Sequence, residues 1–163
     1  MRRLALVVFL GLSFVGIVAV GSPGQTTRNK HELALEGQIA CKEVPRPMAT
    51  ITALQRAGYI SRSPFVVVDS INFFRVKRPM EIFGLPVVSV AGFDYHPRMF
   101  RVSPGTLPGT LLGVVVPRSV AKVRSTLAGK ANLESMWVNQ SMDIVPIRND
   151  RTKVVCLADK ARP

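Results

Sequence analysis

The longest apolar stretch of the chain lies at its start, over residues 4–20. This run of 17 residues carries no charge, follows Arg2 and Arg3, and ends beside the small residue Gly21. Basic residues, an apolar core and small residues in this order are typical of a secretory signal. We therefore expect residues 1–21 to be a signal peptide, with a retained N-terminal anchor as the alternative. Either form predicts export of the remainder, into the periplasm or out of the cell.

The polar and apolar positions that follow indicate one domain with loose ends. Residues 22–38 are polar and show no sustained periodicity, so we expect a flexible arm there, with His31 in solvent. Residues 39–158 contain the periodic segments and form the expected single domain, and residues 159–163 the expected frayed tail. The 142 residues beyond the signal are enough for one domain with a hydrophobic core.

Two segments of this domain, residues 46–59 and 117–130, have apolar residues at helical spacing. Each carries a helix-starting residue near its beginning and, near its end, a glycine that can adopt the left-handed conformation that stops a helix. These residues are Pro47 and Gly58 in the first segment and Ser119 and Gly129 in the second. Each segment therefore predicts one helix.

Short branched or alternating apolar runs bounded by turn residues predict strands. The predicted strands cover residues 64–69, 72–76, 86–94, 99–102, 111–116, 135–139, 143–147 and 152–157. Valine triplets at 66–68 and 114–116 favour central strands covered by helices. The turn residues between the last two runs favour a hairpin. The expected fold is α+β, a mainly antiparallel sheet of about six to eight short strands with two helices packed on it.

The chain has two cysteines, Cys41 and Cys156, near the two ends of the expected domain. In an exported protein an even number of cysteines favours a disulfide. A bridge between residues 115 positions apart would stabilise the fold by about 4 to 5 kcal/mol in the chain-entropy description. The pair predicts a staple between the start and the end of the domain.

The formal net charge is +12, and loss of residues 1–21, with their two arginines, leaves +10. Such an excess favours encounters with anionic partners. The basic residues are scattered. The two densest groups, residues 75–79 with Arg75, Lys77 and Arg78 and residues 148–153, contain three basic residues each, too few for a polybasic run. No aromatic residues interleave with them as in base-stacking proteins, so we expect no specific nucleic-acid binding. The expected partner is an anionic envelope component or an acidic protein, with the membrane involved only if the N-terminal segment is retained.

Two Pro-Gly pairs, Pro104-Gly105 and Pro108-Gly109, predict a rigid loop between strands. Leu107 lies between them as an apolar tip. No G-K-[ST] sequence follows, so this is not a phosphate-binding loop of the Walker type. Together with Arg75, Lys77 and Arg78, the loop residues are the predicted binding site.

Catalytic motifs are weak in this chain. The candidates for a hydrolytic site are His96, its neighbour Asp94, and Ser70 beside Asp69, but Ser70 lacks the G-x-S-x-G context of a nucleophile elbow. No spacing of cysteine, histidine and acidic residues predicts a metal, and no motif predicts a cofactor. The favoured function is binding. A small secreted hydrolase using His96 and a membrane-anchored envelope subunit are the alternatives.

Overall fold

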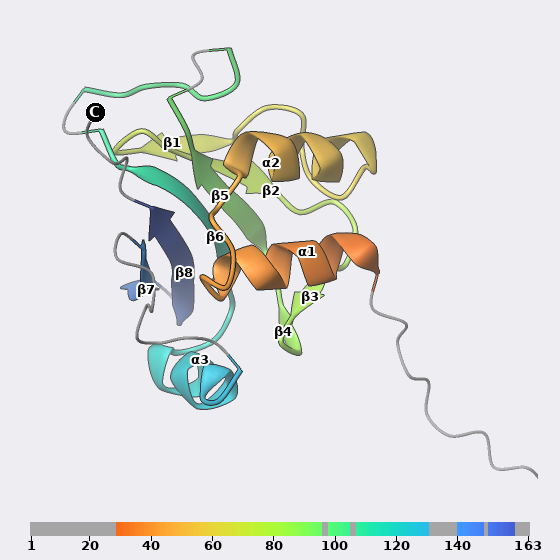
Figure 1. Ribbon diagram of the computed structural model, residues 1–163, viewed down its shortest axis with the longest axis vertical. Coiled ribbons are helices and arrows are strands. Elements are labelled where there is room, and N and C mark those ends of the chain that lie inside the picture. Colours follow the sequence, from red (N-terminus) through yellow and green to blue (C-terminus); the bar gives the residue numbers. More distant parts are fainter. Residues whose placement is uncertain (1–28, 96–97, 105–106, 131–139, 149, 159–163) are drawn as a thin grey trace, which may run out of the picture.

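A six-stranded antiparallel sheet forms the centre of the molecule, with strand order β1-β2-β5-β6-β8-β7 (Figure 1). The computed structural model describes residues 29–95, 98–104, 107–130, 140–148 and 150–158. The strands are β1 (Val66–Val68), β2 (Ile71–Arg75), β5 (Ser89–Phe93), β6 (Thr110–Val116), β7 (Gln140–Ile147) and β8 (Arg151–Ala158), and a separate hairpin contains β3 (Glu81–Ile82) and β4 (Leu85–Pro86). With its helices, this architecture confirms the predicted α+β class.

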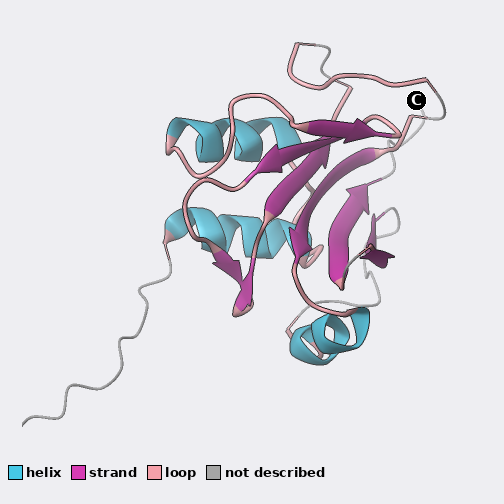
Figure 2. Ribbon diagram, turned by 180° about the vertical axis from the view of Figure 1, so that it is seen from behind, coloured by secondary structure: helices cyan, strands magenta, loops and turns pink. Residues whose placement is uncertain are grey.

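The described residues contain three helices, α1 (Lys30–Ile39), α2 (Pro47–Arg56) and α3 (Val120–Leu127). The first two lie side by side on one face of the sheet, and α3 packs beside β7 and β8 (Figure 1). Between the helices and the sheet lies the main core, which includes the fully buried Phe74, Leu112 and Val114. The opposite face of the sheet is turned away from α1 and α2 (Figure 2).

The helix α1 corrects the expectation of a flexible arm, because residues 30–38 are helical and packed. Asn29 starts the helix: its side chain accepts hydrogen bonds from the backbone of His31 and Glu32, and the Glu32 carboxylate accepts the Asn29 N–H. Leu35 and Ile39, one turn apart, are fully buried. The capping box and this short apolar stripe hold the segment on the sheet. The His31 ring is half-buried, with its centroid 5.8 Å from that of Tyr59.

The two predicted helices are confirmed with their end signals. Pro47 is the first residue of α2, and Gly58 follows its end at φ 74°. The Ser119 side chain caps α3 by accepting the Lys122 N–H, and Gly129 follows that helix at φ 72°. Both glycines adopt the left-handed conformation that a helix end favours.

The strand predictions succeed in part. Val114–Val116 lies in the buried central strand β6, as expected, and β7 and β8 form the expected hairpin. The prediction for residues 66–68 was wrong: β1 is an edge strand, and Val66 and Val68 are 41% and 51% exposed. Residues 99–102 form no strand, and β3 and β4 were not predicted. The expected strand at 135–139 lies outside the described residues.

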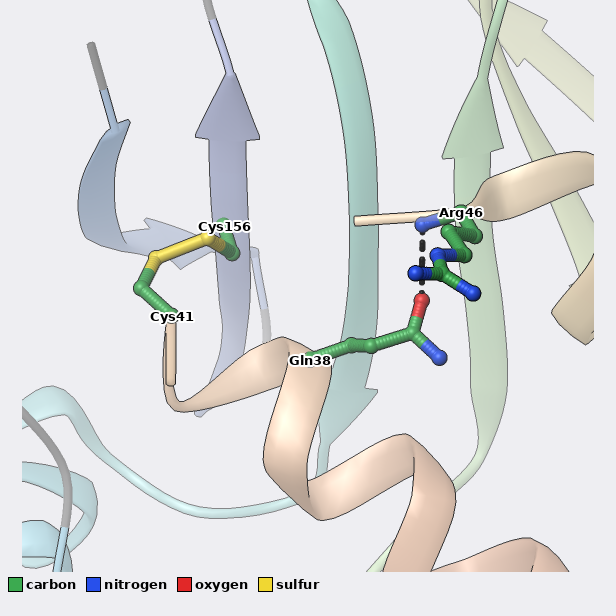
Figure 3. The surroundings of a disulfide bond; sticks show 4 residues. All are labelled: Gln38, Cys41, Arg46 and Cys156. Carbon is green, nitrogen blue, oxygen red and sulfur yellow. Dashed lines mark hydrogen bonds between the residues drawn. A yellow bond between two sulfur atoms is a disulfide. The ribbon is translucent and has the colours of Figure 1, made fainter. Parts of the chain in front are cut away.

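Cys41 and Cys156 form the predicted disulfide, with their Cα atoms 5.5 Å apart. Cys41 follows α1 and Cys156 lies in β8, so the bond fastens the helical layer to the sheet (Figure 3). Close to it, the buried Gln38 side chain accepts the Arg46 N–H at 2.7 Å (Figure 3). The same side chain donates to the Thr50 hydroxyl at 2.9 Å. These bonds join the end of α1 to the start of α2.

The expected signal at residues 1–21 and tail at 159–163 lie outside the described residues. Among the helices that the structure describes, none has the length and apolar character needed to cross a membrane.

Candidate functional site

A groove of about 790 Å³ runs between α2 and two loops, and we call it the arginine groove. One loop, residues 62–64, precedes β1, and the other, residues 98–101, follows β5. Its volume is within the range of roughly 300 to 1,000 Å³ found for small-ligand sites. The groove is therefore large enough to hold part of a ligand of moderate size.

One side of α2 forms a wall of the groove. Its residues at positions 48, 49, 52, 53 and 56 recur at helical spacing and all line the groove. The opposite side of the helix, with Ile51 and Leu54, is buried against the sheet. Ala49 and Ala53 are small, which leaves depth in the groove. The helix thus divides its residues between core and groove.

Four arginines from three segments line the groove, and none of the described residues that line it is acidic. They are Arg56 at the end of α2, Arg62 in the loop that precedes β1, and Arg98 and Arg101 in the loop that follows β5. All four are exposed. A guanidinium presents a rigid fork of donors that matches carboxylate and phosphate oxygens. This composition favours an anionic ligand.

Hydrogen bonds from α2 hold the Arg62 loop in place. The Gln55 side-chain amide donates to the backbone carbonyls of Ser61 and Arg62, at 3.2 and 2.8 Å. The Ser61 hydroxyl donates to the Ser63 carbonyl at 2.8 Å. Because these bonds order the backbone before any ligand arrives, less conformational entropy is lost on binding.

The loop that carries Arg98 and Arg101 is fixed by two buried side chains. The fully buried Asn72 of β2 accepts the Arg101 N–H and donates to the Arg101 carbonyl, both at 2.9 Å. Phe100 is buried in the core, with its ring centroid 6.1 Å from that of Phe93. The backbone that carries Arg98 and Arg101 is therefore held in place by these contacts.

The predicted binding residues Arg75, Lys77 and Arg78 are all exposed, and binding by them stays a prediction. The Arg75 guanidinium lies 5.2 Å from the centre of the Phe65 ring, whereas that of Arg78 lies 5.9 Å from the centre of the Tyr59 ring. Lys77 is exposed, and its backbone N–H donates to the Tyr59 carbonyl. None of the three lines the arginine groove.

The predicted Pro-Gly loop lies between residues 98–101 and β6 in the chain, and none of its described residues lines the groove. Pro104 is exposed, Leu107 is 40% exposed, and Pro108 and Gly109 are half-buried. Gly105 lies outside the described residues. Binding by this loop stays a prediction.

The hydrolytic candidates are only partly placed. His96 lies outside the described residues, and the Asp94 carboxylate accepts the Tyr95 N–H at 2.8 Å. Ser70 is buried, and its hydroxyl donates to the Ser103 carbonyl and accepts the Ser103 N–H. These bonds give Ser70 a role in fixing the loop. Catalysis through His96 stays a prediction.

Sequence reasoning missed Arg56, Arg62, Arg98 and Arg101. They stand in three separate segments without a local motif, so the only available signal was their charge. Within the described ranges, no group of three or more cysteine, histidine or acidic residues is arranged to hold a metal ion. Comparisons with protein-family models, with curated proteins and with solved structures found no match for this chain.

Proposed function

We propose that this chain is an exported binding domain that holds an anionic envelope component in the arginine groove. The observation that carries the proposal is the convergence of four arginines on one groove, with no acidic residue in its described lining. The disulfide supports export, since such bonds persist in oxidising compartments.

A phosphate-bearing envelope component suits this groove better than a purely hydrophilic anion. Met48, Met99 and Phe100 line it beside the four cations, so apolar and cationic surface lie side by side. Guanidinium forks bind phosphate oxygens in pairs, and neighbouring hydrocarbon can cover the apolar part. The alternative ligand is an acidic protein, and the experiment below distinguishes it from a phosphate-bearing envelope component.

Binding to phosphatidylglycerol vesicles, lipopolysaccharide, neutral phosphatidylcholine vesicles and polyglutamate tests the proposal on the chain recovered after export. We expect binding to the first two, weakening as salt screens the charges. An Arg56→Gln/Arg101→Gln variant should lose at least about tenfold in affinity for both, because a hydrogen bond to a charged group contributes roughly 1.5 to 3 kcal/mol.

A Lys122→Gln/Arg124→Gln variant is the matched control, because it removes the same charge from the exposed surface of α3. It should retain the affinity of the parent chain. Equal loss in both variants would mean that net charge alone drives binding. If the chain binds polyglutamate but neither phosphatidylglycerol vesicles nor lipopolysaccharide, its partner is an acidic protein and the proposed envelope ligand is wrong. Export is checked by N-terminal sequencing: Ser22 is the expected first residue, and Met1 in a membrane fraction would indicate the anchored alternative.

A further inference from the structure

A second hollow, of about 460 Å³, lies over the sheet, and we call it the sheet trough. It is on the sheet face that points away from α1 and α2, the face seen in Figure 2. Both edge strands contribute to it: Val66 and Val68 from β1, and Ile147 from β7. Edge strands can line one hollow only if the sheet curves around it, as twisted sheets do. The trough is therefore a concave site on the side of the sheet opposite the main core.

Apolar residues form the floor and one wall of the trough. Phe73 and Val115 lie on the floor and are largely buried. Val66 pairs with Phe73, and the Phe65 N–H also donates to the Phe73 carbonyl. Two consecutive residues at the β1 edge therefore lie opposite one residue of β2, which is the arrangement of a β-bulge. This bulge accounts for two adjacent side chains lining the same hollow.

The trough and its margin expose an unusual amount of hydrocarbon. Phe65 is 52% exposed, and Val66, Val68 and Ile147 are between 39% and 51% exposed. Contiguous apolar surface of this kind marks interaction sites on soluble domains. The helices α1 and α2 lie on the other face of the sheet and do not cover this surface (Figure 2).

Two arginines, Arg75 and Arg151, line the trough, and within the part of the chain that the structure describes no acidic residue lines it. Arg75 lies with its guanidinium 5.2 Å from the centre of the Phe65 ring, a cation–π arrangement that holds the charge beside the apolar wall. An occupant must therefore be apolar along most of its length and anionic at one part.

We propose that the sheet trough binds the aliphatic chain of a small amphipathic anion, with its carboxylate or comparable acidic group paired with Arg75 or Arg151. The hydrocarbon lies over Phe73 and Val115 and against Val66. This site is separate from the arginine groove and does not depend on the proposed function, because the two hollows share no lining residue.

Calorimetric titration of the exported chain with decanoate, decanol and decyltrimethylammonium tests the site. We expect one decanoate per chain, with decanol binding about tenfold more weakly because it lacks the charge that the arginines pair with. The cationic amphiphile should bind more weakly than decanol. Arg75→Gln/Arg151→Gln should reduce decanoate affinity to that of decanol, and Val66→Asn should weaken both ligands.

The Arg56→Gln/Arg101→Gln variant serves as the control, since it changes the other hollow and should leave decanoate affinity unchanged. Loss of decanoate binding in that variant would assign the ligand to the arginine groove and overturn the proposal. Equal affinity for decanoate and decanol, or no binding of decanoate, would overturn it as well. Nuclear Overhauser contacts between decanoate methylenes and the Val115 methyls should be present in the complex, and their absence contradicts the placement.

Discussion

Asn72 is the residue whose side chain does most to shape the arginine groove. It is fully buried in β2 and makes three hydrogen bonds, two to the backbone of Arg101 and one to the Ser70 carbonyl. A buried polar side chain is tolerated when its donors and acceptors are paired, as they are here. Asn72 therefore links the stability of the sheet to the position of the groove wall.

Asn72→Ala should lower the free energy of unfolding by about 1 to 3 kcal/mol, because the Arg101 N–H loses its partner. It should also weaken anion binding, although Asn72 does not line the groove. Urea unfolding and the vesicle titration measure the two effects. Ser125→Ala is the control: it removes an exposed hydroxyl on α3 and should change neither quantity appreciably. Unchanged binding by a folded Asn72→Ala variant would show that the groove wall does not need this clamp.

At the scale of elements, helices could be predicted where their signals were local. The ends of α2 and α3 are marked by a proline, a serine and two glycines within each segment itself. The helix α1 escaped prediction although Asn29 and Glu32 form a capping box. Its buried side includes Glu36 and Gln38. Polar residues such as these are expected in solvent, and their hydrogen-bond partners lie in other parts of the chain.

Strand position could not be predicted from local composition. The valine triplets in β1 and β6 are the same in sequence, yet one forms an exposed edge and the other is buried at the centre. Which strands flank a segment depends on the order of the whole sheet. The arginine groove was missed for the same reason, because Arg56 and Arg101 line one groove only once α2 and the loop after β5 are placed side by side.

Two glycine substitutions should separate helix propensity from packing. Gly92→Ala in β5 should destabilise the protein by about 1 to 3 kcal/mol, since a Cβ there would lie 2.5 Å from the Ile51 Cδ1 atom of α2. Gly37→Ala in α1 should instead stabilise it by about 0.5 to 1 kcal/mol, because alanine favours the helix. The nearest atom to that Cβ would be the flexible Glu43 Oε1 at 3.3 Å. Thermal unfolding of both variants measures the difference. A neutral Gly92→Ala would contradict the close packing of α2 on β5.

At the scale of the whole molecule, the disulfide joins regions 115 residues apart and closes the helical layer onto β8. The sequence predicted this pairing correctly because only two cysteines were available, which left one possible intramolecular bond. The bond restricts the unfolded chain more than it restricts the folded one. Its main effect should therefore be on stability, with little effect on the shape of either hollow.

Cys41→Ala/Cys156→Ala should lower the free energy of unfolding by about 4 to 5 kcal/mol in the chain-entropy description. Both cysteines are fully buried, so part of the measured loss will come from the missing sulfur atoms. Reduction of the parent chain separates these contributions, because it breaks the bond and keeps both sulfur atoms. The single variant Cys41→Ala is a second control that lacks the bond. Urea unfolding with and without dithiothreitol should show a large difference for the parent chain and none for either variant. If the parent chain responds no more than the variants, the bond does not form in the protein tested. A variant that remains folded under native conditions should still bind both anionic vesicles and decanoate, since Cys41 and Cys156 line neither the groove nor the trough.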